Sequence, residues 1–198
     1  MGKIFCLMGK SSSGKDTIYR HLTEDKELQL ERIVPYTTRP VRQGEKDGVE
    51  YHFVTDKELL HCQEQGRVVE LRVYHTVHGT WKYFTVFDEW MNLEKNSYLT
   101  IGTLQSWHDM CKYFGREKMS SIYIEVEDGI RLRRALDREE KQAVPDYSEM
   151  CRRYLADTAD FTEEKLKKEG ITTYFQNRDL ENCLSEIKLF IQKEMRYN

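Results

Sequence analysis

The residues most suited to chemistry form the segment Gly9-Lys10-Ser11-Ser12-Ser13-Gly14-Lys15-Asp16-Thr17, directly after the apolar run 4–8. The apolar run predicts a buried strand, and Ile18 and Leu22 at helical spacing predict a helix after the glycine-rich segment. In such an arrangement, backbone N–H groups and the Lys15 ammonium group point at one place and bind polyphosphate. A serine-rich turn that only caps a helix is the alternative. The candidate phosphate-binding residues are Gly9, Ser11, Ser12, Ser13, Gly14, Lys15, Asp16 and Thr17.

Asp16 stands where a loop of this type usually carries serine or threonine. Lys15 can reach the β- and γ-phosphates, and a hydroxyl group near the helix start can hold Mg²⁺. The Asp16 carboxylate could reach that metal directly or through water, or it could be an acid favoured by the dipole of the helix start. Both interpretations of Asp16 stay open, and Asp16 and Thr17 are the candidate metal ligands.

A second cluster of charged and aromatic residues lies in a loop punctuated by proline and glycine. Arg39 and Arg42 are three residues apart, and two planar guanidinium groups can hold one phosphate group through paired hydrogen bonds. Tyr51 can add a hydroxyl group, and Glu45 can orient the arginines. Taken alone, two arginines in a loop more often form a solvated surface than a binding site.

The elements that must position these residues alternate between strands and helices. Such alternation predicts a parallel sheet with crossover helices, and ligands of such sheets bind at the carboxyl ends of the strands, where the segment 9–17 also falls. Strands are predicted at 98–101, 121–126 and 171–175, and helices at 146–168 and along the apolar stripe of Leu180, Leu184, Ile187 and Ile191.

Two stretches interrupt this alternation. Residues 32–87 contain strand-like runs at 49–54, 68–74 and 81–86, which predict a small, mostly antiparallel insertion. Residues 128–148 carry clustered arginines, and beside a polyphosphate loop they are interpreted as a mobile basic lid rather than a solvated helix face. The predicted core therefore comprises 1–31, 88–127 and 149–198. The clustered lid arginines are Arg131, Arg133, Arg134 and Arg138.

Composition restricts the class of protein. The chain has 198 residues, which suits one α/β domain with insertions. Its 31 basic and 34 acidic residues give a net charge of −3, so no bulk basic field indicates nucleic acid. The five widely spaced cysteines, with no signal peptide and no membrane-spanning run, indicate reduced thiols in a cytoplasmic protein. The histidines His52, His61, His75 and His78 lack metal-ligand spacing.

The segment 37–53 resembles the monophosphate-binding region of guanylate kinases, T-T-R-x-x-R-x-G-E-x-x-G-x-x-Y-x-F, and matches every fixed position. Glu70 then falls at the guanine-reading carboxylate of the family, which accepts hydrogen bonds from guanine N1–H and N2–H₂ and rejects adenine. The family motif V-H-G-N-Y-Y-G-[ST] is similar to residues 77–85 with one extra residue. By that fit Tyr83 resembles the phosphate-binding tyrosine and Thr85 the base-contacting hydroxyl.

The resemblance continues towards the carboxyl terminus, where Arg138 and Arg153 resemble the lid and post-lid arginines and Asn177 begins a stretch similar to N-D-D-L. It implies a P-loop three-layer α/β core with a parallel sheet, a small monophosphate-binding insertion and a short arginine-bearing lid. It also implies phosphoryl transfer from ATP with Mg²⁺ to GMP or dGMP, by a monomer or weak dimer that binds no nucleic acid or membrane. The implied catalytic residues are Lys15, Arg39, Arg138 and Arg153.

Two departures from the family concern the base pocket and the metal. Pro35 replaces the base-contacting serine, and residues 100–103 read T-I-G-T where the family has D-I-D. The family aspartates help to organise Mg²⁺ and hold the guanine side. A nucleotide kinase with a different acceptor, such as a deoxynucleotide or a modified base, is therefore the first alternative. A guanylate-kinase-like binding module and a nucleoside triphosphate hydrolase or switch protein are the others.

Overall fold

A five-stranded parallel sheet forms the centre of the computed structural model, which describes residues 2–42, 44–76, 79–88 and 90–196. Gln43, Val77 and His78, which belong to the motifs above, lie outside the described residues. Every neighbouring pair in this sheet is parallel, as the alternation of strands and helices predicts. The strand order is β2 (Leu30–Arg32), β7 (Ser97–Ile101), β1 (Ile4–Gly9), β8 (Met119–Glu125) and β9 (Tyr174–Gln176).

The central strand β1 is buried along its whole length because both of its faces are covered. Ile4, Cys6 and Met8 pack into the core on one side of the sheet, whereas Phe5 and Leu7 pack into the core on the other. A strand covered on both faces is a continuous apolar run rather than an alternating one. The glycine-rich segment thus starts from the most enclosed strand of the molecule.

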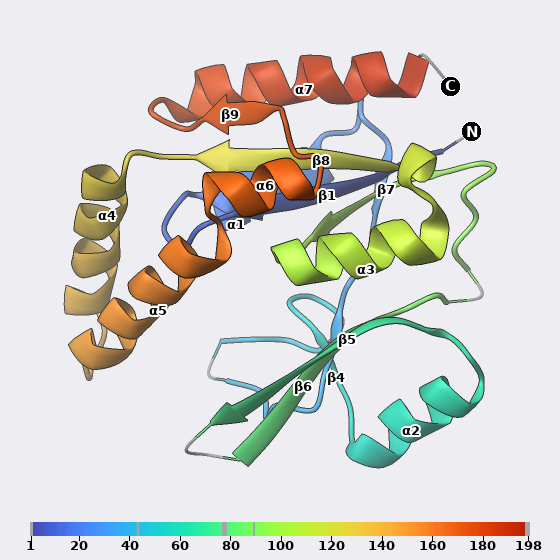
Figure 1. Cartoon of the computed structure of the whole chain (residues 1–198), viewed down its shortest axis with the longest axis horizontal. Helices are drawn as coiled ribbons and strands as arrows, with labels where there is room; N and C mark the ends of the chain where they lie inside the picture. The colour runs from blue at the N-terminus through green and yellow to red at the C-terminus, as the bar shows by residue number, and fades with distance from the viewer. Residues whose placement is uncertain (1, 43, 77–78, 89, 197–198) are drawn as a thin grey trace.

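Helices cover the sheet on both sides, and this arrangement confirms the predicted three-layer fold (Figure 1). Trp107 and Leu166 belong to the core on one side, and Ile18 and Ile187 to the core on the other. The first side carries α3 (Leu104–Phe114) and α6 (Glu163–Lys168), with a short 3₁₀ turn at Arg116–Lys118, and the second carries α1 (Lys15–Glu24) and α7 (Leu180–Arg196).

The insertion forms a separate four-stranded sheet with its own small core of Leu59, Phe84 and Val86. Its two longest strands are antiparallel, but its shortest pair is parallel. The strand predicted over 49–54 is reduced to two residues, because 46–51 form a turn closed by hydrogen bonds between backbone groups. The elements are β3 (Tyr36–Thr37), β4 (His52–Phe53), α2 (Asp56–Glu64), β5 (Val68–Thr76) and β6 (Gly79–Val86).

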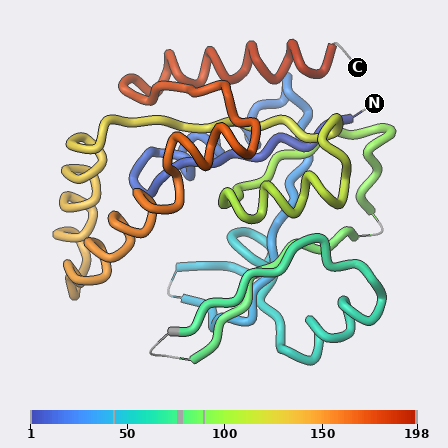
Figure 2. Tube along the Cα trace, in the orientation of Figure 1, coloured from blue at the N-terminus to red at the C-terminus, as the bar shows by residue number. Residues whose placement is uncertain are grey.

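The segment predicted as one helix over 146–168 forms two helices. The first of them lies at one end of the parallel sheet. The helix α5 (Tyr147–Asp160) ends before the buried residue Phe161, and the Thr162 side chain then accepts a hydrogen bond from the backbone N–H of Lys165 to begin α6. A hydroxyl cap of this kind starts a new helix without proline or glycine. The helix α4 (Asp128–Glu140) packs beside α5 at this end (Figure 1, Figure 2).

The remaining predictions on the fold differ from the structure only at element ends. The last strand lies at 174–176 rather than 171–175. All five cysteines carry free thiols. Within the described residues, no helix combines the length and apolarity needed to cross a membrane.

Candidate active site

The glycine-rich loop connects the carboxyl end of β1 to the first turn of α1 and follows a path that side chains would obstruct. Gly14 has a φ of +87°, in the left-handed region that favours glycine. A Cβ atom on Gly9 would lie 2.8 Å from the Ile124 carbonyl oxygen, so only glycine fits there as well. Ser12 also has a positive φ, of +62°. Such strained positions persist where the surrounding structure holds the loop in one shape.

Two hydroxyl groups of this loop are buried and are available to hydrogen-bond a ligand. The Oγ atoms of Ser12 and Ser13 have no hydrogen-bond partner among the described residues. Buried polar atoms without a partner are uncommon, and hydroxyl groups of this kind can donate hydrogen bonds to a bound anion. Lys15 is the first residue of α1, Asp16 beside it is exposed, and Thr17 is half-buried. The loop therefore fits the phosphates predicted for it.

Hydrogen bonds with residues far away in the sequence hold the loop in place. The Asn177 side-chain amide donates to the Ser13 carbonyl at 2.7 Å, and Arg131 Nε donates to the Ser11 carbonyl at 3.1 Å. The Ser11 backbone N–H in turn donates to the Asp157 carboxylate at 2.5 Å. Residues 128–148 are predicted as a mobile basic lid, but Arg131 within them is fully buried and bound to the phosphate loop. Its guanidinium also donates to Asp128 and lies near Asp157, so Arg131 supports the phosphate loop.

The acceptor loop, residues 38–51 between β3 and β4, brings Arg39, Glu45 and Tyr51 together with Tyr83 of β6. Arg39 is 3% exposed and donates two hydrogen bonds of 2.9 Å to the Glu45 carboxylate, which also accepts the Arg42 backbone N–H at 2.8 Å. The Arg39 guanidinium holds the pKa of the Glu45 carboxyl below its usual value. The Arg39 guanidinium lies 5.4 Å from the centre of the Tyr51 ring, whose edge-to-face partner is Tyr83 at 5.5 Å.

Burial raises the pKa of Tyr51, so its phenol stays protonated and can donate a hydrogen bond. Arg39 Nε is a buried donor without a partner among the described residues. A phenol and a guanidinium that both retain unused donors can bind an anion beside them. Arg42, in contrast, is exposed and lies over the Trp81 ring at 5.8 Å.

Glu70 lies on β5 opposite Thr85, two residues along β6 from Tyr83, and its carboxylate is engaged with its neighbours. Its carboxylate accepts Arg72 Nε at 2.9 Å and Arg72 Nη2 at 3.1 Å. Thr85 Oγ1 donates to Glu70 Oε1 at 2.9 Å. The Glu70 and Arg72 side chains are 0% and 14% exposed, so this ion pair is largely removed from water.

One cavity of about 820 Å³ is shared by the phosphate loop and the insertion. Lys15 and Asp16 line it from α1, and Tyr51 and Arg72 line it from the insertion. A smaller cavity of about 330 Å³ is lined by Ser11, Ser12, Arg42, Arg138 and Arg153, together with neighbouring helix residues. The two predicted closing arginines therefore meet beside the phosphate loop. Arg153 is held there by a hydrogen bond of 2.8 Å to Glu149.

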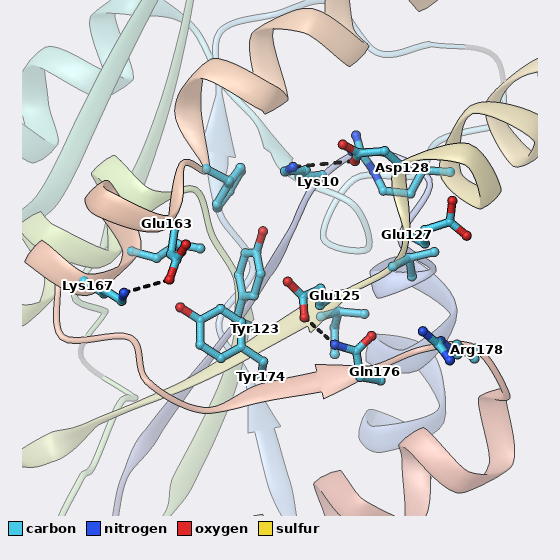
Figure 3. A pocket seen from close by; sticks show the side chains of 15 residues that line it. Lys10, Tyr123, Glu125, Glu127, Asp128, Glu163, Lys167, Tyr174, Gln176 and Arg178 are labelled. Carbon is cyan, nitrogen blue, oxygen red and sulfur yellow. Dashed lines mark hydrogen bonds and ion pairs between the residues drawn. The ribbon is translucent and has the colours of Figure 1, made fainter.

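A further cavity of about 650 Å³ lies between the carboxyl end of β8 and α6 (Figure 3). Two ion pairs lie in its lining: Lys10 with Asp128 at 3.6 Å, and Lys167 with Glu163 at 2.7 Å. The Lys10 side chain lines this cavity and not the one that Lys15 lines. We assign no reaction to this cavity. Elsewhere too, no group of three metal-ligating side chains lies among the described residues.

Comparison with known proteins identifies the family of this chain. A family model described as guanylate kinase matches residues 1–194. The chain belongs to the guanylate kinase family. The guanylate kinase of Wolbachia sp. subsp. Brugia malayi is 30% identical over 198 residues, which cover 98% of this chain and 93% of that protein. The guanylate kinase of Malacoplasma penetrans is 28% identical over 172 residues, which cover 84% of this chain and 74% of that protein.

A solved structure extends the likeness to three dimensions. The crystal structure of guanylate kinase from Anaplasma phagocytophilum matches with a TM-score of 0.65 and 25% sequence identity, covering 98% of this chain and 86% of that chain. The predictions of the α/β fold, the guanylate kinase family and its enzyme class, a nucleoside monophosphate kinase, are thereby confirmed.

The residues at which this guanylate kinase family member departs from the family motifs line the cavity of about 820 Å³. Pro35, Gly102 and Thr103 line the same 820 Å³ space as Lys15. The Thr103 hydroxyl is used to begin α3, where it accepts a hydrogen bond from the Ser106 backbone. The positions that carry aspartates in the family motif thus offer no carboxylate here.

Sequence reasoning missed two residues of the site. Arg72 is two residues after Glu70 on a predicted strand, and strand alternation alone places both side chains on one face. Asp157, in contrast, is separated from Ser11 by 146 residues, and no local pattern connects them.

Proposed function

We propose that this chain transfers the γ-phosphoryl group of ATP to GMP or dGMP, with Mg²⁺ as cofactor. The observation that carries the proposal is the shared cavity, since Lys15 of the phosphate loop lines it together with Glu45 and Tyr51 of the acceptor loop and Arg72 of β5. A hydrolase needs no such acceptor loop, and a binding module needs no intact phosphate loop.

The donor phosphates would lie on the residues Gly9 to Thr17. The backbone N–H groups and the Lys15 ammonium group would neutralise the β- and γ-phosphates, and the free Ser12 and Ser13 hydroxyls would add hydrogen bonds. Asp16 and Thr17 offer the hard oxygen ligands that Mg²⁺ prefers, beside oxygens of the nucleotide itself. When bound, the metal supplies positive charge against the negative charge that develops on the transferring group.

The acceptor phosphate would be held by Arg39, Arg42, Tyr51 and Tyr83. Glu45 positions this group, because it fixes the Arg39 guanidinium through two hydrogen bonds and the Arg42 backbone through one. A guanidinium whose direction is set in advance loses less conformational entropy on binding a phosphate group. The acceptor base would lie toward Glu70 and Thr85, which pair with each other two residues along β6 from Tyr83.

Phosphoryl transfer needs positioning and charge stabilisation rather than a covalent intermediate. Arg138 and Arg153 meet beside Ser11 and Ser12 and would close over the transferring group. Closure of the lid 128–148 and the insertion 32–87 onto the core 1–31, 88–127 and 149–198 would exclude water, which otherwise hydrolyses ATP. The proposed setting is the cytoplasm, with a monomer or weak dimer acting on free nucleotides.

Steady-state assays with ATP and a panel of nucleoside monophosphates test this proposal. We expect equal amounts of ADP and GDP from ATP and GMP. Arg39→Ala should lower kcat/KM for the monophosphate about 10²- to 10³-fold, because a pre-oriented charged donor is lost, while the KM for ATP changes little. Arg196→Ala, at the exposed end of α7, is the control and should retain full activity. Consumption of ATP without any diphosphate product from the panel, or no consumption at all, would overturn the proposal.

A further inference from the structure

The ion pair between Arg72 and Glu70 changes what the acceptor pocket can recognise. A carboxylate has about four lone-pair sites. In Glu70, Arg72 occupies one on each oxygen and Thr85 occupies another on Oε1. Guanine needs both oxygens of one carboxylate for its N1–H and N2–H₂ groups. Glu70 is completely buried and cannot supply both while Arg72 holds it.

No other carboxylate replaces Glu70 at the base end of the cavity wall that the described residues form. The end of β7 continues into Gly102 and Thr103, of which one has no side chain and the other caps α3. Pro35 lacks even a backbone N–H group. The carboxylates that do line the cavity come from α1, α5 and the acceptor loop, and among the described residues none comes from β5, β6 or β7.

Arg72 instead presents hydrogen-bond donors to the cavity. A guanidinium carries five N–H bonds, and Glu70 uses two of them. The Arg72 side chain is 14% exposed and lines the 820 Å³ cavity directly. The pocket wall therefore donates hydrogen bonds where a free carboxylate would accept them.

We propose that Arg72 is the specificity-determining residue of the acceptor site, and that it selects 6-oxopurine monophosphates through O6 and N7 rather than through the 2-amino group. Arginine binds O6 and N7 of guanine through paired hydrogen bonds. Hypoxanthine presents the same two acceptors, whereas adenine presents an amino donor at position 6. This inference rests on the proposed kinase activity and specifies its substrate class: IMP is an acceptor comparable to GMP.

Acceptor kinetics of the unaltered protein give the first test. With ATP as donor, kcat/KM for IMP should be within about threefold of that for GMP, and AMP should be at least a hundredfold poorer. Loss of the N7 acceptor in 7-deaza-GMP breaks the paired contact to O6 and N7 and should lower kcat/KM about five- to a hundredfold. An IMP value more than thirtyfold below that of GMP, or better turnover of UMP or dTMP, would overturn the inference. The proposed function fails separately, if no monophosphate is phosphorylated.

Variants of the ion pair give the second test. Arg72→Met keeps the side-chain length and frees the Glu70 carboxylate, so we expect the ratio of GMP to IMP turnover to rise at least tenfold. Because a lone buried carboxylate can destabilise the fold, the double variant Arg72→Met with Glu70→Gln is measured beside it. It should lose activity on both nucleotides without gaining the GMP preference. Arg67→Met, which removes an arginine paired with Asp88 in the same insertion, is the control. An unchanged ratio in a folded Arg72→Met protein would contradict the assignment.

Discussion

At the scale of single residues, Gly14 and Asn177 show how closely the phosphate loop is packed. A Cβ atom on Gly14 would collide with the side-chain amide nitrogen of Asn177. That amide holds the Ser13 carbonyl at 2.7 Å, and Asn177 is 4% exposed. Backbone conformation and packing therefore both require glycine at position 14.

Gly14→Ala should lower the free energy of unfolding by about 2–4 kcal/mol, because left-handed strain of about 1–2 kcal/mol adds to the loss of the Asn177 contact. Gly44→Ala is a matched control, because Gly44 has the same φ of +87° and no atom within 4 Å of a Cβ added there. It should lose only the strain. Urea unfolding of both variants measures the difference, and equal losses would show that Asn177 does not constrain the loop.

At the scale of elements, α4 and α5 support the phosphate loop rather than forming a freely moving cover. Arg131 on α4 donates to Asp128 at 2.5 Å and to the Ser11 carbonyl at 3.1 Å, and its Nη2 lies 3.7 Å from Asp157 on α5. Arg138, in contrast, is exposed and lies near the end of α4. On α5, hydrogen bonds from Arg152 and Arg153 lower the pKa of Glu149 to about 2.

Arg131→Met should destabilise the protein by about 2–4 kcal/mol. The substitution leaves the Ser11 carbonyl without its hydrogen-bond donor and the Asp157 carboxylate without its ion-pair partner. Arg133→Met on the exposed face of the same helix should change stability by less than about 0.5 kcal/mol. Chemical denaturation at neutral pH compares the two variants with the unaltered protein. Similar values for both would place Arg131 among ordinary surface arginines.

At the scale of the whole molecule, the two sheets differ in how much core supports them. The parallel sheet lies between two large clusters of buried side chains, whereas the insertion has three buried core residues of its own. Small cores open more readily than large ones. The insertion is attached to the α3 face through Val69, which belongs to the larger cluster.

Backbone amides of β6 should therefore exchange with solvent at least tenfold faster than those of β1 and β8. GMP should slow exchange in β6 and the acceptor loop and leave β1 nearly unchanged, because the ligand ties the insertion to the core. Hydrogen exchange followed by mass spectrometry, with and without GMP, measures both effects. Equal protection of β1 and β6 in the free protein would contradict this division of stability.

Much of this molecule could be predicted from local patterns. The loop 9–17 is one continuous segment, and Arg39 lies six residues from the Glu45 carboxylate that binds it, so both could be identified from spacing. The break at Phe161 and Thr162 could not, because helical periodicity continues across it and only a hydroxyl cap interrupts it. Contacts between residues far apart in the sequence could not be predicted from local patterns either. Arg131, for example, donates a hydrogen bond to Ser11, which lies 120 residues earlier in the chain.

The position of β1 between β7 and β8 also governs how the chain can fold during synthesis. β1 is the first strand to be made, yet its neighbours are residues 97–101 and 119–125. At about 5–20 residues per second, the ribosome needs on the order of ten seconds to add them. Throughout that time an apolar strand with two unpaired edges has no native partner, so the strand that carries the phosphate loop is also the one most exposed to aggregation before the domain closes.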